Sequence, residues 1–142
     1  MKKEFLYTPG PVTVPSQVLL SLAEPIYHHR TPRFRTLFKA VNGKLAQVFR
    51  TSNPIVTFAS SGTGAMEASV VNFLSPGDTV ITVNGGKFGE RWTLLAKAYG
   101  LKYHEITLEW GTAPDPADIK KLLDAHPETR AVFTELTETS TG

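Results

Sequence analysis

Residues 60–84 read SSGTGAMEASVVNFLSPGDTVITVN, and this stretch decides the fold class. A glycine-rich turn leads into a helical pattern of apolar residues over 63–74. The turn SPGD follows at 75–78, and the apolar run TVITV predicts a buried strand that begins at Thr79. A helix, a short turn and a buried strand in this order form the repeating unit of α/β proteins.

The same alternation extends to both sides of this stretch. The periodicity and cap residues predict strands over 54–59, 102–108 and 130–136, and helices over 34–49, over 89–99 and from Asp115 and Pro116 onward. Before them come an extended proline-rich arm over 7–15, a short helix capped by Ser16 and a loop over 25–33. We therefore expect an α/β fold with a mainly parallel sheet and helices on both faces, preceded by an arm and short helix over 1–33.

The composition limits the classes of function. The chain has 142 residues, of which 41% are hydrophobic and 20% charged, enough for one domain with a core. A net charge of +2 does not favour nucleic acid, and no run approaches the ~20 apolar residues of a membrane span. Cysteine is absent, and His28 and His29 are adjacent and so would point apart, which argues against a metal site. A cytoplasmic protein without nucleic-acid or membrane partners is expected.

The turn at 59–64, ASSGTG, is suited to an anion. A helix N-terminus exposes unpaired amides, glycines admit a phosphate, and Ser61 and Thr63 add hydroxyl donors. Taken alone, such a turn is more often a capped helix without a ligand. A P-loop would need a lysine after the second glycine, and a dinucleotide fingerprint would need glycine where Glu67 stands. The nucleophile elbow GxSxG is also absent, so ATP, NAD and serine hydrolysis are not favoured.

Two further turns follow predicted strands, at 84–90 and 137–142. Ligands of parallel sheets bind beyond the carboxyl ends of the strands, which is where these turns lie. Phe88 stands between glycines in NGGKFGER, where its ring can either stack on a flat ligand or pack under the loop. The turn TETSTG offers hydroxyls, one carboxylate and a glycine, and by itself indicates only a polar loop.

Five motifs in sequence order carry a resemblance to a known family: TPGPVTVP, HHRTPRF, SSGTGAMEASVVNFLSPGD, NGGKFGER and TETSTG. Together they resemble the N-terminal part of the class V aminotransferases that depend on pyridoxal phosphate, in particular serine–pyruvate, alanine–glyoxylate and serine–glyoxylate aminotransferases. The resemblance runs from about Tyr7 to Gly142. It implies fold type I, with residues 34–142 as an incomplete large domain that binds the cofactor, and a homodimeric full-length enzyme.

The resemblance also implies roles for individual residues. Ser61, Gly62 and Thr63 match the segment that holds the cofactor phosphate, and Phe88 matches the aromatic residue that stacks on the pyridine ring. Ser140 or the neighbouring Thr141 matches the hydroxyl beside the ring. Gly10 in the arm matches a position near the substrate carboxylate, and Glu138 belongs to the same motif with a less defined role. Leu136 replaces a histidine of many members, which weakens the inference about substrate.

The residues that carry out the chemistry in this family lie beyond ETSTG, so we expect no catalytic residue in this segment. The Schiff-base lysine and the aspartate of the pyridine nitrogen are both expected downstream, and neither Lys87 nor Lys97 is in a matching position. The sequence thus predicts the front part of an enzyme that transfers an amino group from serine or alanine to glyoxylate or pyruvate, and predicts that these 142 residues alone are inactive. A lyase or desulfurase of the same cofactor class and a non-catalytic phosphate-binding module remain as alternatives.

Overall fold

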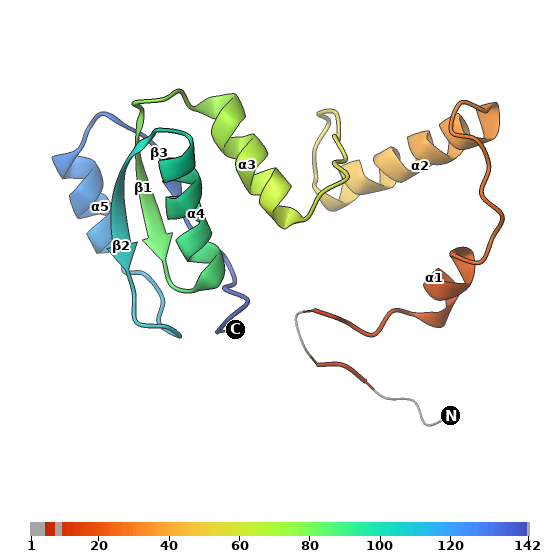
Figure 1. The fold of residues 1–142 in the computed structure, drawn as a ribbon, viewed down its shortest axis with the longest axis horizontal. Helices are drawn as coiled ribbons and strands as arrows, with labels where there is room; N and C mark the ends of the chain where they lie inside the picture. The colour runs from red at the N-terminus through yellow and green to blue at the C-terminus, as the bar shows by residue number, and fades with distance from the viewer. Residues whose placement is uncertain (1–4, 8–9, 142) are drawn as a thin grey trace. The chain divides into compact units, whose positions relative to one another are not determined.

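The computed structural model describes residues 5–7 and 10–141 and divides the chain into two compact units, Met1–Thr57 and Phe58–Gly142. The second unit holds the sheet and three of the helices (Figure 1). The division falls after the long second helix, whereas the sequence placed the end of the arm at residue 33. That domain boundary stays a prediction, because a compact unit is not by itself a domain.

The sheet of the second unit is parallel, as expected. Its central strand β1 (Thr79–Asn84) pairs with β2 (Lys102–Thr107) on one side and with β3 (Thr129–Phe133) on the other. Ile81 lies opposite His104 of β2 and Val132 of β3. Parallel strands end at the same edge, so the segments that follow Asn84, Thr107 and Phe133 emerge side by side.

Helices cover both faces of this sheet (Figure 1). Helix α4 (Lys87–Ala98) packs on one face, where the Thr93 and Thr82 hydroxyl oxygens are 2.8 Å apart. Helix α5 (Pro116–Ala125) lies on the other face, and Asp115 caps it by accepting from the Ala117 amide at 2.8 Å. Helix α3 (Gly62–Phe73) contributes to the core on the α4 side, where the buried cluster consists of Val70, Val80, Leu95, Ala96 and Leu101.

The first unit contains two helices and little buried surface. Helix α1 covers Ser16–Ser21, and helix α2 covers Pro32–Val48 with Pro32 in its first turn. Thr31 caps α2, since its Oγ1 accepts from the Phe34 amide at 3.3 Å. Neither helix has a buried residue, and the apolar face of α2 is open at Leu37 (49% exposed) and Phe38 (45%). The hydrophobic core expected from the chain length is therefore confined to the second unit.

Three details of the sequence prediction are wrong. No strand forms over 54–59, because a strand needs a ladder partner and the sheet pairs only β1 with β2 and β3. The last strand ends at Phe133, short of residue 136. Ser16 is the first residue of α1, whose cap position is held by Pro15 without a side-chain hydrogen bond. The other predicted helices and strands are confirmed to within about two residues at either end. Within the described residues, no helix is both long and apolar enough to cross a bilayer.

Candidate functional site

The N-terminus of α3 has no side-chain cap. Ser61 occupies the cap position in an extended conformation, and its hydroxyl makes no capping hydrogen bond. The Gly64 amide donates to the Ser61 carbonyl at 2.9 Å, as the first helical turn requires. Among the described residues, no side chain accepts from the Gly62 or Thr63 amide. These two amides are therefore free to donate hydrogen bonds, and the positive end of the helix dipole lies at the same place. Both attract an anion.

The N-terminus of α4, by contrast, is already occupied by a carboxylate. Glu138, which lies fifty residues further along the chain, accepts from the Gly89 amide at 2.9 Å and from the Phe88 amide at 3.2 Å. Ser140 completes the arrangement, because its Oγ accepts from the Lys87 amide at 3.2 Å and donates to Glu138 Oε1 at 2.8 Å. The loop after β3 therefore fastens the turn after β1 through the first three amides of α4.

Glycines permit this close approach of the two loops. A Cβ on Gly86 would lie 2.5 Å from Glu138 Cγ, and a Cβ on Gly89 would lie 2.7 Å from the Val83 carbonyl oxygen. Both distances are shorter than carbon–carbon and carbon–oxygen contacts in proteins. The glycines of NGGKFGER thus make room for Glu138 and for the passage from β1 into α4.

The surroundings of Glu138 change its acidity. Partial burial raises the pKa of this carboxyl, but the hydrogen bonds from the Gly89 amide, the Ser140 hydroxyl and the Phe88 amide lower it by more. The net effect is a pKa below the usual value of 4.5, so the group is ionised near neutral pH. A charged carboxylate is the form that complements a helix N-terminus.

Arg91 contacts both the first turn of α3 and the ring of Phe88. Its Nη1 donates to Thr63 Oγ1 at 2.7 Å, and its guanidinium carbon lies 4.6 Å from the centroid of the Phe88 ring. Both contacts are inside the second compact unit, and they bring Thr63 and Phe88 to one side chain. Sequence reasoning did not single out Arg91. Its spacing of three residues from Phe88 was the available signal, because residues i and i+3 of a helix share a face.

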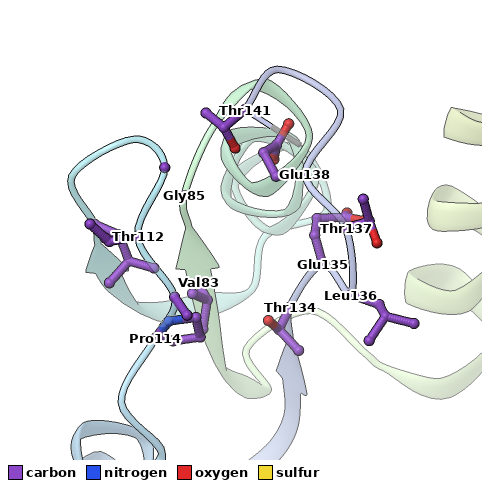
Figure 2. Close-up of a pocket in the computed structure, with 13 residues that line it drawn as sticks. Val83, Gly85, Thr112, Pro114, Thr134, Glu135, Leu136, Thr137, Glu138 and Thr141 are labelled. Carbon is purple, nitrogen blue, oxygen red and sulfur yellow. The ribbon is translucent and has the colours of Figure 1, made fainter. Parts of the chain in front are cut away.

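A pocket of about 280 Å³ opens at the carboxyl edge of the sheet. Val83 of β1, Leu108 after β2 and Thr134 after β3 line it, together with Glu138 and Thr141 of the loop after β3. Figure 2 shows Val83 and Thr134 near the strand ends, with Glu138 and Thr141 beyond them. This position is where parallel sheets bind ligands.

The predicted site residues fall into three places. Ser61, Gly62 and Thr63 form the start of α3, and Phe88 lies in the first turn of α4 rather than in a loop after the strand. Ser140 and Thr141 lie on the loop after β3, where the Thr141 amide donates to the Glu138 carbonyl at 3.2 Å. Arg91 and Glu138 connect these places through the contacts given above. Gly10 is exposed and belongs to the first unit, and Gly142, the last residue of TETSTG, lies outside the described residues.

The two lysines near these motifs are turned to other partners. Lys87 Nζ pairs with Glu90 Oε2 at 2.8 Å on the exposed side of α4. The Lys97 ammonium lies 5.3 Å from the centroid of the Tyr103 ring, at the opposite end of the helix. Neither contact places an amine beside Phe88.

A cluster of His104, His126 and Glu128 lies on the α5 face of the sheet, with potential ligand atoms within 4.8 Å of one another. The two imidazole rings are stacked with centroids 3.6 Å apart and planes 19° from parallel. A metal ion lies close to the plane of each imidazole that binds it, at about 2.0–2.1 Å. Two nearly parallel rings stacked at this separation cannot share one ion, so we assign the cluster a packing role between α5 and β2.

The site therefore combines an open helix N-terminus, an aromatic ring and a hydroxyl-rich loop at the carboxyl edge of a parallel sheet, an arrangement that α/β enzymes use for phosphorylated ligands. Residues 14–142 match the family model described as aminotransferase class-V, and the chain belongs to this family. Its fold corresponds to part of the large domain of fold type I enzymes. The family implies pyridoxal phosphate as cofactor.

Individual relatives agree with this assignment. The chain is 42% identical to a soluble hydrogenase small subunit of Synechococcus sp., over 99% of this chain and 37% of that protein. It is 33% identical to a serine–glyoxylate aminotransferase of Methylorubrum extorquens, over 99% of this chain and 36% of that protein. An aspartate aminotransferase of subgroup IV from Thermus thermophilus superposes with a TM-score of 0.77 at 39% identity, over 82% of this chain and 33% of that one. The chain thus spans about a third of the length of these relatives.

Proposed function

We propose that this chain is the cofactor-binding front part of a pyridoxal-phosphate-dependent aminotransferase. The observation that supports this most directly is the α3 N-terminus, which has no internal cap although the neighbouring α4 N-terminus has a complete one. An unpaired set of amides and a hydroxyl suit a dianionic phosphate. The residues present therefore fit the group that the family implies.

Each residue of the proposed cofactor site has a separate task. The Gly62 and Thr63 amides, with the Ser61 and Thr63 hydroxyls, hold the phosphate. Phe88 stacks on the pyridine ring and fixes its orientation. Phe88 would thereby fix the orientation in which the ring meets the reacting bond of the substrate, and the cofactor, when bound, would supply the electron sink for that bond.

Of Ser140 and Thr141, the hydrogen bonds favour Thr141 as the residue whose hydroxyl lies beside the pyridine ring. The Ser140 hydroxyl already donates to Glu138 and accepts from the Lys87 amide. A hydroxyl has a single hydrogen to donate, so Ser140 has none left for a ligand. The Thr141 hydroxyl makes no hydrogen bond with another described residue, and Thr141 lines the pocket. We assign Ser140 to the support of α4 and Thr141 to the ligand.

The proposed substrates are a small amino acid, serine or alanine, as donor and a 2-oxo acid, glyoxylate or pyruvate, as acceptor. Relatives named as glyoxylate aminotransferases support this choice. Gly10 is assigned to the neighbourhood of the substrate carboxylate by the family motif alone. The Schiff-base lysine is not among the lysines near the site, since Lys87 and Lys97 face other partners. We therefore propose that these 142 residues do not transaminate by themselves.

A homodimeric full-length protein is also proposed. The open apolar face of α2 supports it, because exposed apolar faces of this kind mark surfaces that another chain or segment covers. Light scattering coupled to size exclusion, on the protein expressed from its whole reading frame, gives the mass directly. A mass of twice the monomer is expected, and a monomeric mass contradicts the proposal. The cytoplasmic location expected from the sequence stays a prediction.

The proposed function is tested on that same whole-reading-frame protein. We expect it to bind pyridoxal phosphate with a visible absorbance band that borohydride reduction removes, and to convert serine or alanine with glyoxylate or pyruvate into the paired products. The 142-residue chain, assayed in parallel, is expected to give no product. Cofactor binding with elimination or sulfur release in place of amino transfer would favour the lyase or desulfurase alternative. Phosphate binding without cofactor chemistry would favour the non-catalytic module.

A further inference from the structure

Arg91 stands at the junction of the two parts of the proposed cofactor site. It lies one turn into α4, is half-buried, and contacts Thr63 at the start of α3 and the face of Phe88. Among the described residues, no other side chain combines a hydrogen bond to Thr63 with a ring contact to Phe88. The family motif and the sequence reasoning assign it no role.

The chemistry of the Arg91–Thr63 hydrogen bond fixes the direction of the Thr63 hydroxyl. A guanidinium can only donate hydrogen bonds, so Thr63 Oγ1 accepts this one at 2.7 Å. The hydrogen of the hydroxyl then has to be directed to another acceptor, and no described residue provides one. Thr63 consequently presents a donor at the same place where the Gly62 and Thr63 amides present theirs.

Arg91 is also held in place by its second contact. Its guanidinium lies over the Phe88 ring, an arrangement in which a planar cation stacks on an aromatic face. The stacking restricts the rotamers of both side chains, and the proposed ligand would stack on the opposite face of the ring. The permanent positive charge of arginine behind Thr63 adds attraction for an anion at the α3 N-terminus.

We propose that Arg91 is a positioning residue for the phosphate group of the cofactor. It orients Thr63 as a hydrogen-bond donor, so that the protein selects the phosphorylated form of pyridoxal over the unphosphorylated form. Its contact with Phe88 serves the ring that both forms share and therefore contributes little to this selectivity. This inference rests on the proposed function, because it assumes that pyridoxal phosphate is the ligand.

The test compares two ligands on the whole-reading-frame protein after removal of bound cofactor. Equilibrium affinities for pyridoxal phosphate and for pyridoxal are measured for wild type, Arg91→Met, Thr63→Val and the double variant. The ratio of the two affinities isolates the phosphate contribution. We expect Arg91→Met to lower the affinity for pyridoxal phosphate about tenfold or more, as for a lost hydrogen bond to a charged group, and to change that for pyridoxal about threefold or less. Arg130→Met, on the exposed part of β3, is the matched control and is expected to match wild type.

The double variant distinguishes positioning from direct contact. If Arg91 acts through Thr63, the double variant loses little more phosphate selectivity than either single variant. Additive losses would mean that Arg91 binds the phosphate directly and would overturn the positioning role. A ratio in Arg91→Met equal to that of wild type would overturn the proposal altogether. A wild-type protein that binds neither ligand would instead reject the proposed function.

Two further variants distinguish a loss of phosphate selectivity from a folding defect in Arg91→Met. Arg91→Lys keeps a donor for Thr63 but lacks the planar stacking group, so it is expected to recover part of the selectivity. Thr63→Val alone keeps the Arg91 side chain and its contact with the Phe88 ring, and should reduce selectivity by a similar factor. If both variants retain the wild-type ratio, the proposal is wrong whatever the fate of Arg91→Met.

Discussion

Helices α3 and α4 both begin beside glycines in the same compact unit, yet the amides at their N-termini meet different partners. The amides of α4 are taken by Glu138 and Ser140 from the loop after β3. The amides of α3 have no side-chain cap. The side chain that contacts this helix start is Arg91, which donates a hydrogen bond to the Thr63 hydroxyl and, being a cation, cannot accept one from the amides. One helix start is completed by the chain itself, whereas the other is proposed to bind an external anion.

The unpaired amides of a helix N-terminus can serve either to fasten a loop of the same chain, as in α4, or to bind a ligand, as we propose for α3. A carboxylate from within the chain fixes two loops and leaves no room for a second anion. The α3 N-terminus has hydroxyls and the Arg91 cation beside it but no such carboxylate, so it can still attract an anion. Substitutions that make one helix start resemble the other, or that weaken one of them, test this difference.

The largest effect is expected from placing a carboxylate at the α3 start. Ser61→Asp supplies an internal anion where the phosphate is proposed to bind. Two unit charges about 4 Å apart interact by roughly 4 kcal/mol at an effective dielectric constant of 20. We therefore expect the affinity for pyridoxal phosphate to fall at least about 100-fold. Ser61→Asn, a neutral cap of the same size, is the control, and an equal loss in both variants would show that charge is not the cause.

The second effect concerns the filled helix start. Glu138→Ala removes the acceptor of the Phe88 and Gly89 amides, and we expect a loss of about 2 kcal/mol in the free energy of unfolding. Urea unfolding measures this loss, and amide hydrogen exchange at Phe88 and Gly89 is expected to speed up. Glu135→Ala, whose carboxylate has no hydrogen bond to another described residue, should stay within about 0.5 kcal/mol of wild type. Equal effects at the two positions would contradict the capping role.

A smaller effect is expected from crowding the same loop. Gly86→Ala brings a Cβ to 2.5 Å from Glu138 Cγ, so the loop has to move, and we expect a loss of about 1 kcal/mol. Gly43→Ala in the middle of α2 meets nothing within 4 Å and is expected to stabilise by about 0.5 kcal/mol. The opposite signs of the two changes, measured by urea unfolding, distinguish a close approach from a general effect of alanine.

The smallest effect is the dependence of stability on pH. The pKa of Glu138 is lowered in the folded protein, so its ionised form stabilises the fold above the unfolded value of about 4.5. This contribution is lost as the pH falls through the lower folded pKa. Wild type and Glu138→Gln are therefore expected to differ most near neutral pH and to converge as the pH falls below the folded pKa of Glu138. A constant difference down to acidic pH would show that charge plays no part.

The sequence allowed most of the fold to be predicted, because the signals were local. The apolar period of 3.6 located α2 to α5, and the runs at 79–83 and 102–108 located β1 and β2. The strand expected over 54–59 failed for a non-local reason, since an apolar run becomes a strand only where a neighbouring strand supplies its hydrogen bonds.

The site was predictable in part for the same reason. The glycine-rich motifs marked the turns that hold Thr63, Phe88 and Ser140, but the partners of these residues come from distant segments. Glu138 reaches the α4 amides across about fifty residues, and Arg91 reaches Thr63 across twenty-eight. Only the folded chain shows that one loop serves as a cap and that one arginine joins the two halves of the site.

The most direct test of the account is a crystal structure of the whole-reading-frame protein with pyridoxal phosphate bound. We predict that the phosphate lies at the start of α3, within hydrogen-bond distance, about 2.7–3.2 Å, of the Gly62 and Thr63 amides and the Thr63 hydroxyl. Glu138 is predicted to stay on the Phe88 and Gly89 amides. A phosphate at the start of α4 with Glu138 displaced, or bound away from both helices, would contradict the account.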